Sequence, residues 1–187
     1  AAMAGATVAV TSSAVTANAT TTFYATFSDA ASNFSACSTA SFAFTNDTIG
    51  PSIAITSPAA SSYINIANNT TTFTVSGTCN DTTAVTVKVD GANATSQVGG
   101  TCDGTNFTST VDVTGLAAGA RSFTAVIADA AANSTTSAAI SVTKDVTAPA
   151  LAITAAPTWI NIANKAAYVA SGTCSDGSDP PLPSQAS

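Results

Sequence analysis

The sequence predicts an all-β protein built from small sandwich domains in tandem, and three observations support this prediction. Charged residues make up only 7% of the 187 residues, and all ten acidic residues are Asp. Because Glu and Lys favour helices whereas Val and Thr favour strands, this composition indicates strands. Short runs of the chain alternate apolar and polar residues with the period of two that is typical of strands. Finally, segments about 95–100 residues apart resemble one another, a spacing typical of a whole sandwich domain.

The repeat is clearest in two short segments. The pentapeptide Ile-Asn-Ile-Ala-Asn at residues 64–68 returns at residues 160–164. The tetrapeptide Ser-Gly-Thr-Cys that ends at Cys79 returns with its end at Cys174. Since both segments recur in the same order and at nearly the same offset, the chain is expected to be a piece of an array of similar domains.

Linker segments place the domain boundaries. Residues 47–56 correspond to residues 145–154, and each segment contains a proline just before a short apolar strand. We therefore expect one complete domain over residues 51–147. Residues 1–50 would be the C-terminal half of such a domain, and residues 148–187 the N-terminal half.

The complete domain is expected to hold about seven strands and no helix. Alternate side chains of each strand are apolar, so they would face a core between two antiparallel sheets. Asp90 and Gly91 lie between two such runs and predict a tight hairpin turn, because both central positions must accept positive φ. The apolar positions that mark the strands are Ile53 and Ile55; Phe73 and Val75; Val85, Val87 and Val89; Phe107, Val111 and Val113; Phe123, Ala125 and Ile127; and Ile140 and Val142.

The two partial domains carry strand patterns of their own. In the first, apolar and polar residues alternate at residues 8–11, 22–28 and 41–45. In the second, Leu151 and Ile153 repeat the first strand of the complete domain. Neither half could bury its apolar face alone.

The second half of the complete domain resembles a bacterial immunoglobulin-like repeat of the kind found in long secreted adhesins and other surface proteins. The resemblance depends on residues 113–123, on the Asp129–Asn133 segment and on the Asp-x-Thr-Ala-Pro linker at residues 145–149. It implies tandem immunoglobulin-like β-sandwiches, one complete and two partial. In that family the Leu and Gly of the first segment form the corner between strands E and F, and the Asp-x-x-x-Asn turn joins F to G. One departure is Asn18, which stands where Gly119 does.

The four cysteines are expected to form disulfides. Because the chain has no His and no Cys-x-x-Cys, a zinc site of the ordinary type is excluded, and disulfides imply an oxidising compartment. In a sandwich of this order strand B ends where strand E begins, so Cys79 and Cys102 should pair. Cys37 and Cys174 would come within reach of each other only if the partial domains of two consecutive subunits completed one another.

Composition excludes several function classes. The net charge is −6 and the four basic residues are scattered, whereas a nucleic-acid partner requires a basic surface. No apolar run approaches the roughly 18–20 residues of a membrane-spanning helix, so no membrane insertion is expected. Without His, Glu or a phosphate-binding glycine loop, we expect no enzyme and no cofactor other than calcium.

Six Asp and Asn residues form the one constellation that could bind a metal. Calcium prefers several hard oxygen ligands, and adhesins of the resembled family hold calcium at domain junctions. The alternative, which we favour, is that the Asp–Asn pairs form turns and the linker Asp residues cap the linkers. The six residues are Asp29, Asn33, Asp47, Asp129, Asn133 and Asp145.

Two further patterns concern the surface. Nine of the twelve Asn residues are N-glycosylation sequons, although polar strands rich in Asn and Thr would produce many of them without glycosylation. Tyr63 and Trp159 share one repeat position, where an aromatic residue could bind a sugar or, as we favour, pack against its neighbours. The sequons begin at Asn18, Asn33, Asn46, Asn68, Asn69, Asn80, Asn93, Asn106 and Asn133.

These observations predict a structural and adhesive segment of an extracellular bacterial surface fibre or stalk. Its expected partners are neighbouring copies of the same repeat or subunit, and a glycan or host-surface ligand is a further candidate. The alternatives are a carbohydrate-binding accessory module of a secreted protein and an immunoglobulin-like decoration of a phage particle. The two half domains have two interpretations. Either the chain is a window within a longer repeat protein, or consecutive subunits complete each other head to tail into a filament.

Overall fold

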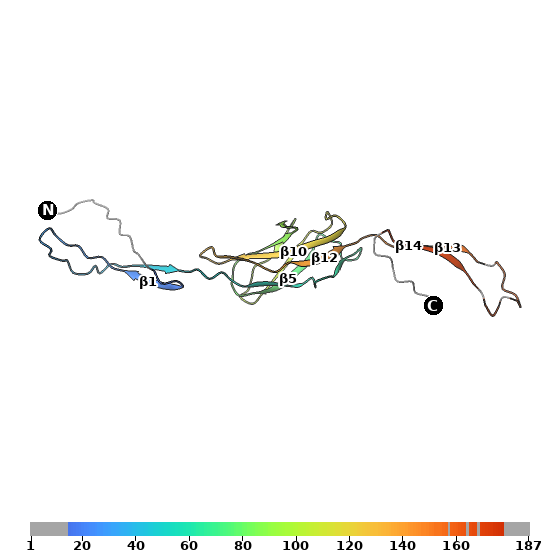
Figure 1. The fold of residues 1–187 in the computed structure, drawn as a ribbon, viewed down its shortest axis with the longest axis horizontal. Coiled ribbons are helices and arrows are strands. Elements are labelled where there is room, and N and C mark those ends of the chain that lie inside the picture. Colours follow the sequence, from blue (N-terminus) through green and yellow to red (C-terminus); the bar gives the residue numbers. More distant parts are fainter. Residues whose placement is uncertain (1–14, 157, 164, 168, 178–187) are drawn as a thin grey trace.

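The computed structural model describes residues 15–156, 158–163, 165–167 and 169–177, and these residues form strands and no helix. The strands fall into three groups along the chain, an N-terminal hairpin, a central sandwich and a C-terminal hairpin (Figure 1). The predicted all-β fold is thus confirmed. Within these residues no helix is long and apolar enough to cross a membrane. The predicted strand at residues 8–11 lies outside the described residues.

Two sheets face each other in the central sandwich, and strands that follow one another in the sequence often lie in different sheets. The first sheet has the strand order β3-β5-β9-β8, and the second has β4-β12-β10-β6-β7 with β11 on the side of β10. All pairs are antiparallel except β4 with β12. The first sheet comprises β3 (Ile53–Ser57), β5 (Phe73–Cys79), β8 (Val98–Gly99) and β9 (Asn106–Val111). The second comprises β4 (Tyr63–Ile64), β6 (Val85–Val89), β7 (Ala92–Asn93), β10 (Gly119–Ala128), β11 (Ser134–Thr136) and β12 (Ile140–Lys144).

The core lies between these sheets and consists of the alternating apolar side chains that the sequence predicts. Phe73 and Phe123 meet across it with ring centroids 6.0 Å apart. Of the predicted core positions, Ile53 and Ile140 are only half-buried and pack at the margin. Burial of this apolar surface is the main favourable contribution to folding. The fully or nearly fully buried apolar residues include Ile64, Val75, Val87, Phe107, Val111, Val113, Phe123, Ile127 and Val142.

The predicted Asp90-Gly91 turn is confirmed. Asp90 has a φ of 52° and Gly91 a φ of 83°, and the turn joins Val89 to its partner Ala92. Asp90 also accepts hydrogen bonds from the backbone N–H of Ser122 and from the guanidinium of Arg121, both at 2.9 Å. The turn is therefore tied to the neighbouring strand β10.

The N-terminal hairpin pairs β1 (Ala19–Phe23) with β2 (Phe42–Asn46). The predicted strand at 22–28 is wrong in its bounds, because β1 ends at Phe23 and Ser28 makes only an isolated bridge to Phe34. In the sandwich, the second half of β10 is held between β6 and β11. Among the described residues no equivalent of β6 lies beside residues 24–28, so the ladder is not continued there.

The C-terminal hairpin pairs β13 (Ala150–Ala155) with β14 (Ser171–Ser175). Leu151 and Ile153, the predicted strand positions, both lie in β13. Neither hairpin pairs with the central sheets, and in Figure 1 the two hairpins lie on opposite sides of the sandwich. This arrangement agrees with three units, while the boundaries at residues 50 and 147 stay a prediction.

Candidate functional site

The C-terminal hairpin has the same strand register as the first two strands of the sandwich. Leu151 pairs with Cys174 just as Ile53 pairs with Cys79. In both hairpins the register shifts directly after the pairing of an isoleucine with a glycine, at Ile153 in one and at Ile55 in the other. The repeated sequence therefore specifies the same local structure twice.

Close backbone contact explains why the glycine recurs in this register. A Cβ added to Gly77 would lie 1.9 Å from the carbonyl oxygen of Ala54, and one added to Gly172 would lie 2.4 Å from that of Ala152. No side chain can occupy either position unless the backbone shifts. The glycine of the Ser-Gly-Thr-Cys repeat is thus a requirement of strand packing.

The N-terminal hairpin has the register of β10 with β12. Phe23 pairs with Phe42 as Phe123 pairs with Ile140. This register places Ala19 in the position of Gly119, so the alignment of Asn18 with Gly119 is wrong by one residue. The positive φ of 57° nevertheless falls on Asn18, because Asn adopts the left-handed region more easily than Ala does.

The turn that follows is also reproduced in detail. The Asp129 carboxylate accepts hydrogen bonds from the backbone N–H and the side-chain Nδ2 of Asn133, both at 2.9 Å. The Asp29 carboxylate accepts the same two bonds from Asn33, at 2.9 and 3.0 Å. The side-chain hydrogen bond from the Asn is the main cause that lowers the pKa of each Asp, since it favours the charged carboxylate.

The six candidate calcium ligands lie in three places rather than in one cluster. Asn133 Nδ2 donates to the carbonyl oxygen of Asp47 at 3.2 Å, so Asp47 and the Asp129 turn meet where the chain enters the sandwich. Asp145 lies where the chain leaves it, with its N–H donating to Ile64 at 2.8 Å. Asp29 and Asn33 belong to the N-terminal hairpin.

The turn interpretation accounts for the hydrogen bonds that these residues make. The linker carboxylates cap their own linkers, Asp47 accepting from the N–H of Ile49 at 3.1 Å and Asp145 from that of Thr147 at 2.9 Å. Within the described part of the chain no three His, Cys, Asp or Glu residues are grouped to hold a metal. Calcium binding stays a prediction, and melting curves with and without a chelator are its direct test.

Unlike the sandwich, both hairpins expose the apolar side chains that correspond to its core. Ile153 is 73% exposed whereas Ile55 is 8% exposed, and Phe44 is 45% exposed whereas Val142 is fully buried. Ile160, the repeat-mate of the fully buried Ile64, is 66% exposed. These open faces are the most distinctive surface of the molecule.

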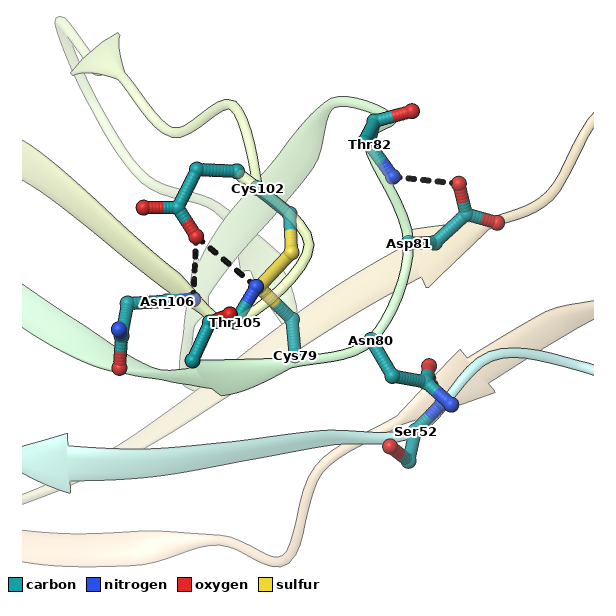
Figure 2. Close-up of a disulfide and its surroundings, with 9 residues drawn as sticks. Ser52, Cys79, Asn80, Asp81, Thr82, Cys102, Thr105 and Asn106 are labelled. Atoms are coloured by element: carbon teal, nitrogen blue, oxygen red, sulfur yellow. Dashed lines mark hydrogen bonds between the residues drawn. A yellow bond between two sulfur atoms is a disulfide. The ribbon is translucent and has the colours of Figure 1, made fainter.

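The predicted disulfide is present. Cys79 ends β5 and Cys102 precedes β9, the neighbouring strand, with a Cα–Cα distance of 6.2 Å. Both are buried, and the carboxylate of Asp103 accepts the N–H groups of Thr105 and Asn106 just beyond the bridge (Figure 2). The bridge closes a loop that contains β6, β7 and β8. This closed loop restricts the conformations of the unfolded chain.

The other two cysteines are unpaired in this chain and exposed. Cys37 lies between β1 and β2, and Cys174 lies in β14. Because the two belong to hairpins on opposite sides of the sandwich (Figure 1), they cannot pair within one copy. A bridge between subunits stays a prediction.

The remaining surface candidates are positioned as follows. Tyr63 is 58% exposed and Trp159 is 80% exposed, and the favoured packing role of these aromatic residues stays a prediction. Glycosylation stays a prediction, although several sequon amides, such as those of Asn68 and Asn133, are engaged in hydrogen bonds of the fold. The exposed sequon residues are Asn18, Asn33, Asn80, Asn93 and Asn106, and the half-buried ones are Asn46, Asn68, Asn69 and Asn133.

Sequence analysis missed one structurally important residue, Lys144. Its side chain is buried, and its Nζ donates to the carbonyl oxygens of Val113 and Thr114 at 2.6 and 2.8 Å. The signal was present, because Lys144 follows Ile140 and Val142 at inward-facing positions. The amide of Asn46, which occupies the same register position in β2, reaches toward two carbonyl groups of the preceding segment at 3.5 Å.

No protein-family model matches the chain, and no curated protein matches it significantly. The immunoglobulin-like resemblance therefore stays a prediction that depends on the motifs given above.

Proposed function

We propose that this chain is a structural segment of an extracellular fibre or stalk built from tandem immunoglobulin-like sandwiches. One observation supports the proposal most strongly. A complete sandwich is flanked on each side by a hairpin whose register matches two strands of that sandwich. The N-terminal hairpin matches β10 with β12, and the C-terminal hairpin matches β3 with β5. Such an arrangement is typical of an array in which one unit follows another.

The contacts at the two ends of the sandwich suit a load-bearing role. On the entry side, Asn133 holds the carbonyl of Asp47, and Pro51 is buried at the start of β3. On the exit side, the N–H of Asp145 is bonded to Ile64. These contacts attach both linkers to the sandwich, so they limit bending between consecutive units and would hold a distal part away from the cell.

Surface chemistry and the disulfide support a location outside the cell. A buried disulfide is formed and kept in oxidising compartments, and the chain carries very few charges. The core between the two sheets consists of apolar side chains. We expect adhesion, where it occurs, to depend on neighbouring copies or on a distal ligand-binding part.

A carbohydrate-binding module is the second candidate, and one observation favours it. Tyr63 is exposed beside two open hollows, one lined by Pro58, Asn68 and Phe73 and the other by Ile66 and Pro149 among others. An exposed aromatic ring beside polar side chains is a surface on which a sugar could stack. The second hollow includes the exit linker, so a following unit would partly cover it.

Glycan binding and molecular length test the two functions against each other. A stalk segment should give no signal above background on a glycan array, and small-angle scattering should show a rod whose length grows in proportion to the number of units. Tyr63→Ala should change neither result. Specific binding to a glycan that Tyr63→Ala abolishes would contradict the structural proposal and support the binding module.

A further inference from the structure

We propose that the C-terminal hairpin of one copy and the N-terminal hairpin of a second copy complete each other into a sandwich like the central one. The C-terminal part comprises β13, β14 and the Trp159–Ile160 segment, and the N-terminal part comprises β1 and β2. This inference rests on the proposed function, because it names the partner of each open face within the array. Its five supporting observations concern chain geometry, backbone pairing, apolar faces, the junction and the match of registers.

The two hairpins of one copy cannot complete each other, so we assign each open face to a second copy. The entry linker ends beside Asn133 and Thr135, since a Cβ on Gly50 would lie 2.8 Å from Thr135 Oγ1. The exit linker begins beside Ile64, which accepts the N–H of Asp145. The hairpins consequently extend in opposite directions, as Figure 1 shows.

Backbone pairing in the sandwich defines how the two hairpins would join. In the sandwich, β4 adds in parallel to the outer edge of β12, with Tyr63 opposite Thr143 and Ile64 opposite Lys144. The N–H of Thr143 donates to Ser62 at 3.0 Å, on the chain just before Tyr63. In the C-terminal part the same position is held by Trp159 and Ile160.

The edge that would receive this strand is available in the N-terminal hairpin. Among the described residues β2 pairs with β1 alone, which leaves its other edge open. Register equivalence places Trp159 opposite Thr45 of the second copy and Ile160 opposite Asn46. Addition of a strand to an open sheet edge is a common mode of recognition, in which main-chain hydrogen bonds provide affinity and side-chain pockets provide specificity.

The apolar faces of the hairpins complement each other as they do in the core. The mates of Ile153, Ile160 and Phe44 are Ile55, Ile64 and Val142, and all three mates are buried between the sheets of the sandwich. Side chains that are 73%, 66% and 45% exposed in a single chain would therefore be removed from water in the composite. An open apolar face of this kind is typical of an interaction surface.

The junction contact would be reproduced as well. In the sandwich, Asn133 Nδ2 holds the carbonyl of Asp47 in the preceding linker. The Asn33 turn of the second copy has the same geometry as the Asn133 turn. It would hold the carbonyl of Asp145, which is the repeat-mate of Asp47, so the composite would be attached to its neighbour in the same way.

A partner of different structure would have to supply a strand pair with this same register, the same turn and an open edge. The chain itself supplies all three in β1 and β2. The structure therefore favours a second copy over an unrelated protein, and successive completion would produce a linear filament.

A mixing experiment with two blocked variants tests the proposal. Phe44→Asp places a charge on the open face of the N-terminal hairpin, and Ile153→Asp does the same in the C-terminal hairpin. Each variant alone keeps only one working face and should sediment as a monomer. An equimolar mixture should form a capped heterodimer, with a dimer fraction at least about tenfold above that of either variant alone, a difference of 1.4 kcal/mol. The wild-type chain should form longer species as its concentration rises.

Matched controls separate loss of the face from loss of folding. Ala43→Asp and Ala152→Asp place the same charge on the opposite faces of the same strands and should assemble like the wild type. All four variants should keep the melting transition of the central sandwich, because the hairpins lie outside its core.

In a chain without any of these aspartate substitutions, a short bis-maleimide should join Cys37 of one copy to Cys174 of another. The cross-linked species should disappear in Cys37→Ser.

A wild-type chain that stays monomeric at all concentrations, or a mixture of blocked variants that forms no heterodimer, would overturn the proposal. Assembly that Ala43→Asp and Ala152→Asp abolish equally would overturn it too, since the inward faces would then have no special role. These failures leave the stalk function untouched, because that function is tested by glycan binding and by the length of the rod. A positive glycan array would contradict the stalk without affecting the sedimentation result.

Discussion

The central sandwich and the terminal hairpins have the same strand registers but opposite burial. Ile55 and Ile153 follow the same pairing pattern, yet the first is 8% exposed and the second 73%. The Asp129 and Asp29 turns share every hydrogen bond between Asp and Asn. Local sequence is therefore sufficient to specify register and turn geometry, whereas burial requires the facing sheet.

This difference separates two contributions to stability. Turns, glycine contacts and cross-strand pairs act within one hairpin and add modest free energies. The hydrophobic contribution depends on apolar area removed from water, which the sandwich gains and a lone hairpin does not. Substitutions at register-equivalent positions should therefore have large effects in the sandwich and small effects in the hairpins.

The largest difference should appear at the paired positions Phe123 and Phe23. Phe123 is fully buried, so Phe123→Ala should lower the free energy of unfolding of the sandwich by about 3–5 kcal/mol through lost burial and the cavity left behind. Phe23→Ala should change the same quantity by less than about 0.5 kcal/mol. Urea unfolding followed by circular dichroism measures both. Equal losses would mean that the hairpin packs on the sandwich in solution.

The disulfide should give the next largest effect. Replacing Cys79 and Cys102 together with Ala should destabilise the sandwich by about 2–4 kcal/mol, because the loop they close gains conformational freedom in the unfolded state. Replacing the exposed Cys37 and Cys174 in the same way should leave sandwich stability unchanged. Thiol titration provides the check on pairing, with two reactive thiols in the native chain and four after reduction in denaturant. Four reactive thiols before reduction would contradict the bridge.

A smaller effect is expected at Lys144 and its equivalent Asn46. Lys144→Ala removes the ammonium donor from the carbonyl groups of Val113 and Thr114, of which Val113 keeps a bond from the N–H of Leu116 at 3.2 Å, so stability should fall by about 1–3 kcal/mol. Asn46→Ala removes two contacts of 3.5 Å at the outer limit of a hydrogen bond, and we expect less than about 0.5 kcal/mol. Thermal unfolding of both variants beside the wild type measures the difference. A Lys144→Ala variant as stable as the wild type would show that water satisfies the carbonyl groups.

Features that depend on short-range pattern could be predicted from the sequence. Period-two alternation located the core strands, the Asp90-Gly91 pair located a hairpin turn, and strand order located the Cys79–Cys102 bridge. Each of these depends on residues close in sequence or on the order of strands in the sandwich. The repeat itself predicted that the same local structures would occur twice.

Features that depend on long-range contacts could not be predicted in this way. Strands β4, β7 and β8 have two residues each, too few to show a period, and they exist because a longer neighbour binds them. The predicted strand at 22–28 ended early because no equivalent of β6 lies beside it among the described residues. The contact of Asn133 with Asp47 joins residues 86 positions apart, and no local sequence pattern predicts it.

The smallest predicted effect concerns acid. In the sandwich the pKa values of Asp103, Asp112 and Asp129 are below the ordinary value of 3.8. The chief donors to the Asp103 carboxylate are the backbone N–H groups of Asn106 and Thr105. The chief donor to Asp112 is the Thr114 hydroxyl, and the chief donor to Asp129 is the side-chain amide of Asn133. Asp29 in the N-terminal hairpin has a lowered pKa for the same reason as Asp129.

A lowered pKa in the folded state means that these carboxylates stabilise the fold at pH values above their ordinary pKa. That contribution should disappear as the pH falls below about 4 and passes through the folded-state pKa values, because protonation removes the charged acceptor. The melting temperature of the sandwich should therefore decrease between pH 5 and pH 2. Asp129→Asn should lower the melting temperature at pH 7 and reduce its further decrease in acid, whereas Asp29→Asn should leave both unchanged, since its turn lies outside the sandwich. Calorimetric scans at the two pH values compare the three proteins, and an identical acid response in Asp129→Asn and the wild type would show that this turn contributes nothing to the pH dependence.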